Sequence, residues 1–267
     1  MKHLSISIII ILLIAYSCSN SNQKDKLIYK NDTSLVMNYI FGTYDSISKQ
    51  SIWYTKDTSI LTVFGSTGKI KLTSKLLSIN KISQSGKDFL YVITENFINQ
   101  NQCHSCAPLL RFSLFEINDL NILTFKYSSN IEQYGSWGES SRFEFIKMGP
   151  QSYGYLFFPG FTSAGITNED LVMYALINGK LTKLLNIENV YMDNLGDCDS
   201  TQGNCFTYNY EYYFHPELPR KILYDFELIR KGTLFQNNKL QLINDTAIYK
   251  YIDNRYIKIL TFSQNHK

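Results

Sequence analysis

The stretch Phe206-Thr-Tyr-Asn-Tyr-Glu-Tyr-Tyr-Phe214 decides the fold class of this chain. Every even-numbered position in it is aromatic, whereas most odd-numbered positions are polar. Successive side chains of a β-strand point to opposite faces of a sheet, so this alternation predicts a strand with one packed face and one face in water. We therefore expect a protein that is built mainly from strands.

The same period of two extends on both sides of this stretch. Residues 171–177 and 180–187 flank Asn178-Gly179, a pair that supplies the two positive φ angles of a type I′ hairpin turn. Further strands are expected at residues 59–63, 89–94, 110–117, 122–127, 142–147, 153–158 and 221–228, with a closing hairpin at residues 247–252 and 256–260. Glycine and proline recur between these segments, which is typical of an antiparallel meander.

Helical signals are confined to the N-terminal part of the chain. Thr33 or Ser34 could cap a short helix that ends near Gly42, and a second short helix is expected around residues 70–77. The predicted fold is therefore mainly β: an antiparallel meander that forms a sandwich or open barrel, with one or two short helices near the N-terminus. The sequence contains no 40-residue repeat that would indicate a propeller.

The first eighteen residues resemble the export signal of bacterial lipoproteins. An apolar run of about ten residues follows Lys2, which is too short to cross a bilayer core of roughly 30 Å. Ala15-Tyr16-Ser17 then leads into Cys18, as in a lipobox, where a small residue precedes the cysteine that becomes acylated. The alternative is ordinary secretion with Cys18 removed or unmodified.

This resemblance implies the domain organisation and the address. Residues 1–17 would be the signal peptide, residues 18–26 a flexible polar tether, and residues 27–267 a single β-rich domain. Acyl chains on Cys18 would make the membrane a permanent partner. Ser19 stands where lipoproteins kept at the inner membrane carry Asp, which implies an outer-membrane location in the bacterial cell envelope, on its periplasmic or surface side.

Charge and histidine content exclude several classes of function. The formal net charge is +3 and no run exceeds two basic residues, which disfavours a nucleic-acid partner. Since His3 belongs to the signal and His266 to the C-terminal end, a Ser-His-Asp hydrolase would have to use His104 or His215. The G-x-S-x-G elbow, the phosphate-binding loop and the dinucleotide fingerprint are all missing from the sequence.

Four cysteines remain besides Cys18. Cys198 and Cys205 lie in a polar loop that a local disulfide would close. Several possibilities are open for Cys103 and Cys106: a local disulfide, crossed pairing with the other two cysteines, a redox-active dithiol, or inert thiols. A metal site is the fifth possibility, built from four thiolates or from three thiolates and His104.

The segment Cys-His-Ser-Cys-Ala-Pro at residues 103–108 and the later Gly135-Ser-Trp137-Gly138-Glu resemble a group of bacterial exported proteins and lipoproteins. The likeness covers roughly residues 85–190. It implies an extracytoplasmic β-rich domain, without an established activity, in which His104 and Trp137 are the candidate functional residues. The alternative for Trp137 is a half-buried aromatic residue in a turn flanked by glycines.

The remaining candidate site is the acidic loop with Asp193, Asp197 and Asp199. Its carboxylates could bind Ca²⁺, but their spacing does not fit a D-x-D-x-D-G loop, so we expect a solvated loop and no cofactor. The leading prediction is a membrane-anchored, non-enzymatic binding or structural domain whose aromatic residues could bind a glycan or a protein. The alternative is an extracytoplasmic redox-active or metal-binding protein that uses Cys103, His104 and Cys106.

Overall fold

The computed structural model describes residues 32–98, 103, 106–216 and 222–263. The predicted signal peptide, Cys18 and nearly all of the N-terminal part before the first helix lie outside the described residues, as does His104. In the described part the chain is mainly β, with two short helices toward its N-terminal side, as predicted. No helix in this part combines the length and the apolar character that crossing a membrane requires.

A five-stranded antiparallel sheet forms the first layer of the molecule, and its spatial order follows the sequence. Its strands are β1 (Gln50–Thr55), β2 (Ile70–Gln84), β3 (Lys87–Phe97), β4 (Leu109–Ile117) and β5 (Leu123–Gln133). The small hairpin of β6 (Gly135–Ser136) and β7 (Glu139–Ser140) then leads to a second sheet.

The second sheet has nine antiparallel strands in the order β16-β15-β14-β13-β12-β11-β9-β8, with β10 paired to β11. These strands are β8 (Arg142–Lys147), β9 (Tyr153–Phe158), β10 (Gly160–Ser163), β11 (Ile166–Ile177), β12 (Lys180–Asp193), β13 (Thr207–His215), β14 (Asp225–Gln236), β15 (Lys239–Ile252) and β16 (Arg255–Ser263). The 3₁₀ turn η1 (Ser200–Gln202) lies in the loop between β12 and β13.

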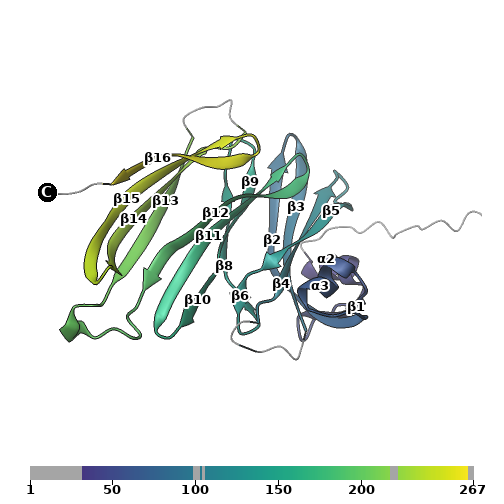
Figure 1. Ribbon diagram of the computed structural model, residues 1–267. Coiled ribbons are helices and arrows are strands. Elements are labelled where there is room, and N and C mark those ends of the chain that lie inside the picture. The colour runs from purple at the N-terminus through teal and green to yellow at the C-terminus, as the bar shows by residue number, and fades with distance from the viewer. Residues whose placement is uncertain (1–31, 99–102, 104–105, 217–221, 264–267) are drawn as a thin grey trace, which may run out of the picture.

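This large sheet turns back over itself between β12 and β13. The two strands share only the pairs Met192↔Tyr208 and Asp193↔Thr207 among the described residues. Beyond these pairs β13 crosses the sheet, and the ring of Phe158 on β9 lies 6.0 Å from that of Tyr210 on β13. Strands β13–β16 therefore form a third layer, and Figure 1 shows the three layers side by side.

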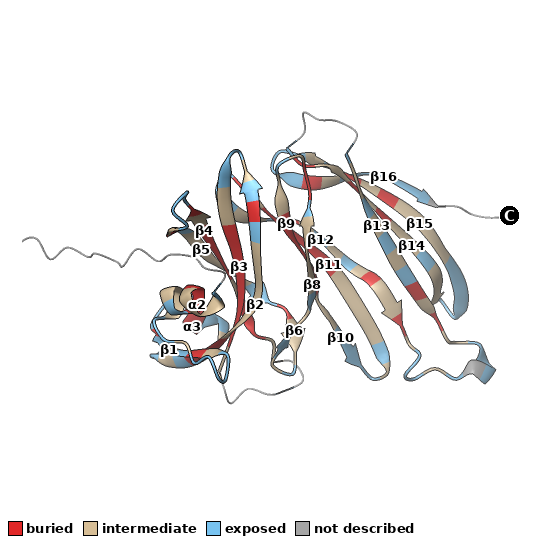
Figure 2. Cartoon of the chain, turned by 180° about the vertical axis from the view of Figure 1, so that it is seen from behind, coloured by how far each residue is buried: buried red, intermediate tan, exposed pale blue. Residues whose placement is uncertain are grey.

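In the middle layer, which consists of β8–β12, strand β9 and the second half of β11 are buried on both faces. One set of its side chains packs against the first sheet: Tyr155, Phe157, Val172 and Tyr174. The alternate set packs against the third layer: Leu156, Phe158, Leu171, Met173 and Ala175. Strand β9 and residues 171–177 of β11 consequently read as continuous apolar runs, because a strand that is covered on both sides loses the polar alternation. The buried positions are red in Figure 2.

The architecture confirms the predicted fold class. The strands do not close into a barrel, and the face-to-face packing of the layers fits a sandwich. The aromatic stretch that predicted it is β13, whose Tyr210, Tyr212 and Phe214 pack against the core. Its Asn209 and Glu211 are exposed, as the alternation requires.

The far face of the first sheet is covered by the helix α2 (Thr33–Phe41). Val36 of this helix packs into a cluster with Val92 and Phe115 of the sheet. Asp32, rather than the predicted Thr33 or Ser34, caps the helix by accepting a hydrogen bond from the Ser34 amide at 2.8 Å.

Two sequence predictions about elements are wrong, and a third differs from the structure in where the strand begins. Residues 59–63 form the helix α3 (Thr58–Val63), because Asp57 caps it and Ile60 and Leu61 face the sheet. Residues 70–77 begin β2 rather than a helix, since they pair with β1 and β3 on both sides. The strand expected from residue 221 begins at Asp225.

Candidate functional site

A groove opens where β13 leaves part of the middle layer uncovered. It consists of two hollows, of about 570 and about 470 Å³, and both are lined by Arg142, Glu169 and Tyr191. The first hollow follows residues 209–213 of β13. The second extends to the β6–β7 hairpin and to β10, so the two form one elongated surface depression.

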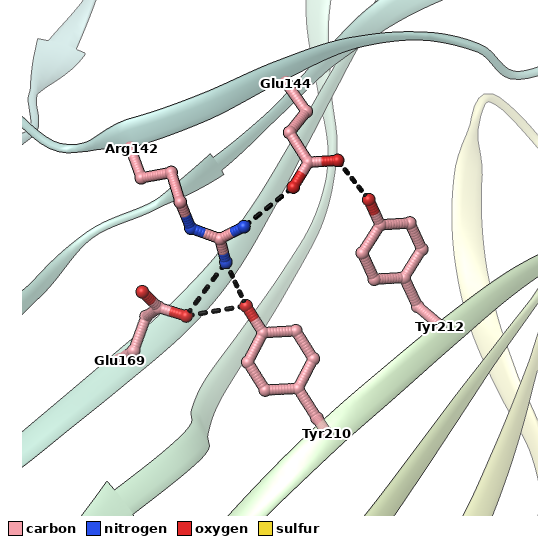
Figure 3. A network of polar contacts seen from close by, with 5 residues as sticks. All are labelled: Arg142, Glu144, Glu169, Tyr210 and Tyr212. Carbon is pink, nitrogen blue, oxygen red and sulfur yellow. Dashed lines mark hydrogen bonds and ion pairs between the residues drawn. The ribbon is translucent and has the colours of Figure 1, made fainter.

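Arg142 is the centre of a polar network on the floor of this groove, shown in Figure 3. Its Nη1 donates to Oε1 of Glu144 at 2.7 Å, and its Nη2 donates to the Tyr210 hydroxyl at 2.5 Å. The Tyr210 hydroxyl donates to Oε1 of Glu169 at 2.6 Å, and the Tyr212 hydroxyl donates to Glu144. Two tyrosines of the third layer therefore bind carboxylates of the middle layer.

The period of two along each strand brings these groups together. Arg142 and Glu144 are two residues apart on β8, and Tyr210 and Tyr212 are two residues apart on β13, so each pair shares one face. The guanidinium of Arg142 also lies 3.7 Å above the centre of the Phe158 ring, which favours it through a cation–π interaction.

Arg142 and Tyr210 of the network keep their protonation states at neutral pH. Burial alone would lower the pKa of Arg142, but Tyr210, Glu169 and Glu144 together raise it. Burial, and next the hydrogen bond to Glu169, raise the pKa of Tyr210 far above its ordinary value. The guanidinium therefore stays charged and the phenol stays a donor. Among the described residues that line the groove, carboxylates predominate: Arg142 is the single cation beside Glu139, Glu169 and Glu211.

One wall of the groove is the edge of β13. This strand pairs with β14 along its whole length, from Tyr208 to His215. On its other side, its described pairing with β12 stops at Tyr208. Residues 209–215 consequently have no strand partner on one side among the described residues, and five consecutive residues of this segment line the first hollow.

Trp137 stands on the opposite side, at the tip of the β6–β7 hairpin. Trp137 (φ 55°) and Gly138 (φ 78°) are the two central residues of the turn and both have positive φ angles. Such a conformation costs a non-glycine residue about 1–3 kcal/mol, so the surrounding structure must hold it. The Trp137 amide donates to the Cys103 carbonyl at 3.2 Å, and the Gly138 amide donates to the Cys106 carbonyl at 2.7 Å. The Trp137 side chain is 59% exposed.

A second exposed aromatic residue, Phe161 of β10, lines the same hollow and is 54% exposed. It is held by the hairpin of β10 and β11, in which Phe161 pairs with Asn168. Trp137 and Phe161 thus place two accessible rings beside the polar floor.

The four described cysteines form two local disulfides, Cys103–Cys106 and Cys198–Cys205. The crossed pairing that the sequence left open is therefore excluded in this structure. Redox activity would require the Cys103–Cys106 bridge to open, and a metal site would require its thiolates, so both alternatives remain predictions about the reduced protein. In the described part of the chain, no three His, Cys, Asp or Glu side chains converge to hold a metal ion.

The candidate Ca²⁺ carboxylates serve local turns. Asp193 accepts hydrogen bonds from the Leu195 amide and the Tyr191 hydroxyl. Asp199 accepts from the amide and the hydroxyl of Thr201. Asp197 instead lies against the tip of the β10–β11 hairpin, where its Cβ is close to Gly165.

His215 lies at the end of β13, where its Nε2 is 2.8 Å from Oε2 of Glu227 on the neighbouring strand β14. It is not one of the residues that line the groove. The His-carboxylate pair that a hydrolase would need is present, but it lies apart from the groove.

Sequence reasoning named Trp137 as a candidate, and the structure places it beside the groove, but sequence reasoning missed the Arg142 network. The alternation in residues 206–214 predicted which tyrosines share a face. Their partners could not be predicted, because they come from strands that are 41 and 68 residues away in the chain. Comparison of the chain with protein-family models, with curated proteins and with solved structures gave no match.

Proposed function

We propose that this protein is a lipid-anchored, non-enzymatic binding protein of the bacterial cell envelope, most simply of the outer membrane. Its ligand is an elongated molecule that lies in the groove between β13 and the two exposed aromatic rings. The observation that carries this proposal is the groove itself: accessible Trp137 and Phe161 flank an ordered network around Arg142. Binding sites commonly combine apolar contact surface with a few fixed polar groups in this way.

The anchor rests on the sequence of residues 1–18 and is tested separately. The N-terminal peptide of the protein purified from membranes should begin at Cys18 and carry acyl chains in its mass spectrum. A Cys18→Ser variant should leave the membrane fraction. Recovery of Cys18 without acyl chains would refute the anchor and leave the groove proposal untouched.

The binding function is tested on arrays of oligosaccharides and of extended peptides, with the full chain in detergent micelles. We expect at least one class of probe to bind. Its affinity should fall roughly thirtyfold in Trp137→Ala, because an aromatic residue that the ligand buries commonly contributes this much to binding. Leu120→Ala is the matched control, because Leu120 is also an exposed apolar residue but does not line the groove. Binding that is unaffected by Trp137→Ala, or no binding at all, would refute the function.

A further inference from the structure

The edge of β13 differs from the edge of an ordinary sheet because it lies inside a depression. Residues 209–215 have one unpaired backbone side among the described strands, and residues 209–213 of this segment line the groove. The N–H and C=O groups of such an edge are a template for another strand. A seven-residue strand has a length of roughly 23 Å and would run alongside β13, past the Arg142 network.

The charges of the groove restrict what could occupy this template. In the described part of the groove, the carboxylates Glu139, Glu169 and Glu211 outnumber the single guanidinium of Arg142. Glu211 is exposed on β13 itself, with Nζ of Lys231 on β14 at 3.9 Å from its Oε2, and an added strand would lie on the other side of Glu211. Oppositely charged cross-strand neighbours stabilise a pair of strands and like charges destabilise it. The site therefore favours a cationic segment.

We propose that the occupant of the groove is an extended, lysine- or arginine-rich polypeptide segment of a partner protein, which adds to β13 as a further antiparallel or parallel strand. The main-chain hydrogen bonds supply affinity, while alternate side chains reach the groove floor and the rings of Trp137 and Phe161. This inference rests on the proposed binding function and specifies the class of its ligand. A neutral glycan is the competing occupant and is an outcome of the test below.

The test uses the peptide Lys-Val-Lys-Val-Lys-Val-Lys and two matched probes. In the first, alternate backbone amides on one edge are N-methylated, with the two possible edges tested separately. In the second, every Lys is replaced by Glu. Calorimetry with the full chain in micelles should show binding of the parent peptide, at least a tenfold loss for one of the methylated forms, and no binding of the acidic form. Methylation of one edge removes the main-chain donors of one added strand and leaves the side chains in place.

Two measurements on the protein complete the test. Hydrogen exchange should slow at residues 209–215 on peptide binding, whereas the outer edge strand β16 should be unaffected and serves as the internal control. Glu211→Lys should weaken the parent peptide at least tenfold, and the affinity of the wild type should fall with added salt. Glu211→Gln should give an intermediate affinity.

The outcomes separate this inference from the proposed function. If oligosaccharides bind and lose affinity in Trp137→Ala while the lysine peptide does not bind, the function stands and the strand-addition inference is wrong. Equal binding of both methylated peptides and the parent peptide, or exchange at residues 209–215 that does not change, also overturns the inference. If neither class of probe binds, both proposals fail.

Discussion

The two disulfide loops have the same chemistry but act on the structure in different ways. The Cys103–Cys106 loop binds another segment of the chain: its two cysteine carbonyls accept hydrogen bonds from the amides of Trp137 and Gly138. The Cys198–Cys205 loop forms its hydrogen bonds mainly with the residues next to it in the chain. The Asn194 side chain donates to the Asn204 carbonyl and accepts from the Phe206 amide. A short disulfide can therefore either fix the conformation of a neighbouring turn or close its own loop.

The comparison explains why two motifs that are about thirty residues apart in the sequence belong together. Trp137 has a positive φ angle that a bulky residue rarely adopts. The carbonyls that hold this turn come from Cys103 and Cys106. The first loop thus determines where an exposed aromatic ring of the groove lies, whereas the second loop contacts the β10–β11 hairpin through the Gly196 amide and the Gly165 carbonyl.

The largest expected effect on stability comes from replacing a glycine with alanine in the hairpin beside each disulfide loop. A Cβ on Gly135 would lie 1.9 Å from the Glu139 carbonyl oxygen, and a Cβ on Gly165 would lie 2.3 Å from Cβ of Asp197. Both glycines also have positive φ angles. We expect Gly135→Ala and Gly165→Ala each to lower the free energy of unfolding by about 3 kcal/mol, from overpacking and backbone strain together. Urea denaturation measures this.

Gly179→Ala is the matched control for these two substitutions. Gly179 has a positive φ angle too, but a Cβ there meets nothing within 4 Å. Its cost should therefore be the backbone contribution of about 1 kcal/mol. Hydrogen exchange at the Trp137 amide should accelerate in Gly135→Ala and stay unchanged in Gly165→Ala. Equal costs for all three variants would mean that steric contact does not distinguish the hairpins.

The second prediction removes each bridge in turn. The first bridge closes a loop of 4 residues and the second a loop of 8 residues, counting both cysteines. The chain-entropy relation then gives about 1.9 kcal/mol for the first bridge and about 2.5 kcal/mol for the second. Cys103→Ser with Cys106→Ser should therefore be the less destabilising pair. It should nevertheless be the pair that accelerates exchange at the amides of Trp137 and Gly138.

A smaller loss of stability combined with faster exchange at Trp137 would show that the first bridge fixes the turn, whereas the second bridge only closes its own loop. If the Cys198→Ser and Cys205→Ser variant also accelerates exchange at Trp137, the hairpin responds to general stability rather than to the first loop. If the first variant leaves that exchange unchanged, the two hydrogen bonds to the cysteine carbonyls hold the turn without the bridge.

How far the sequence predicted this molecule depends on the range of the contacts. Residues 142–147 and 153–158 were predicted correctly as strands, because alternating or continuous apolar residues and bounding glycines and prolines are local signals. Residues 59–63 were predicted wrongly from β-branched residues, although Asp57 carried a local capping signal for the helix. The packing of β13 across the middle layer had no local signal in the sequence. The Arg142 network depends on this packing.

The third prediction concerns a buried carboxylate beside the first loop. Glu95 of β3 is 6% exposed and accepts hydrogen bonds from the amide and the hydroxyl of Ser140, next to the Trp137 turn. Burial raises its pKa above the ordinary value, although Lys75 opposes this. The folded protein therefore holds this proton more tightly than the unfolded chain does. Its contribution to stability is complete below the ordinary pKa and is lost as the pH rises through the folded-state pKa.

Glu95→Gln tests this contribution, because glutamine keeps an acceptor for Ser140 without the charge. We expect the variant to be more stable than the wild type at pH 7, by less than either bridge contributes, and the difference to vanish near pH 4. Denaturation curves across this range measure it. A wild type that is the more stable protein at pH 7 would mean that attraction to Lys75 outweighs the cost of burial.

The smallest expected effect, with the opposite dependence on pH, lies in the second loop. Asp199 is solvent-exposed there, and hydrogen bonds first from the Thr201 hydroxyl and then from the Thr201 amide lower its pKa. A carboxylate with a lowered pKa stabilises the fold above its ordinary pKa, and this contribution is lost as the pH falls through the folded-state value. Asp199→Asn should therefore be slightly less stable than the wild type at pH 7 and equal to it at strongly acidic pH. Since Glu95→Gln changes stability in the other direction at pH 7, the two variants measured under the same conditions assign each pH dependence to one loop. If both substitutions changed the free energy of unfolding at pH 7 in the same direction, the predicted electrostatic difference between the two loops would be wrong.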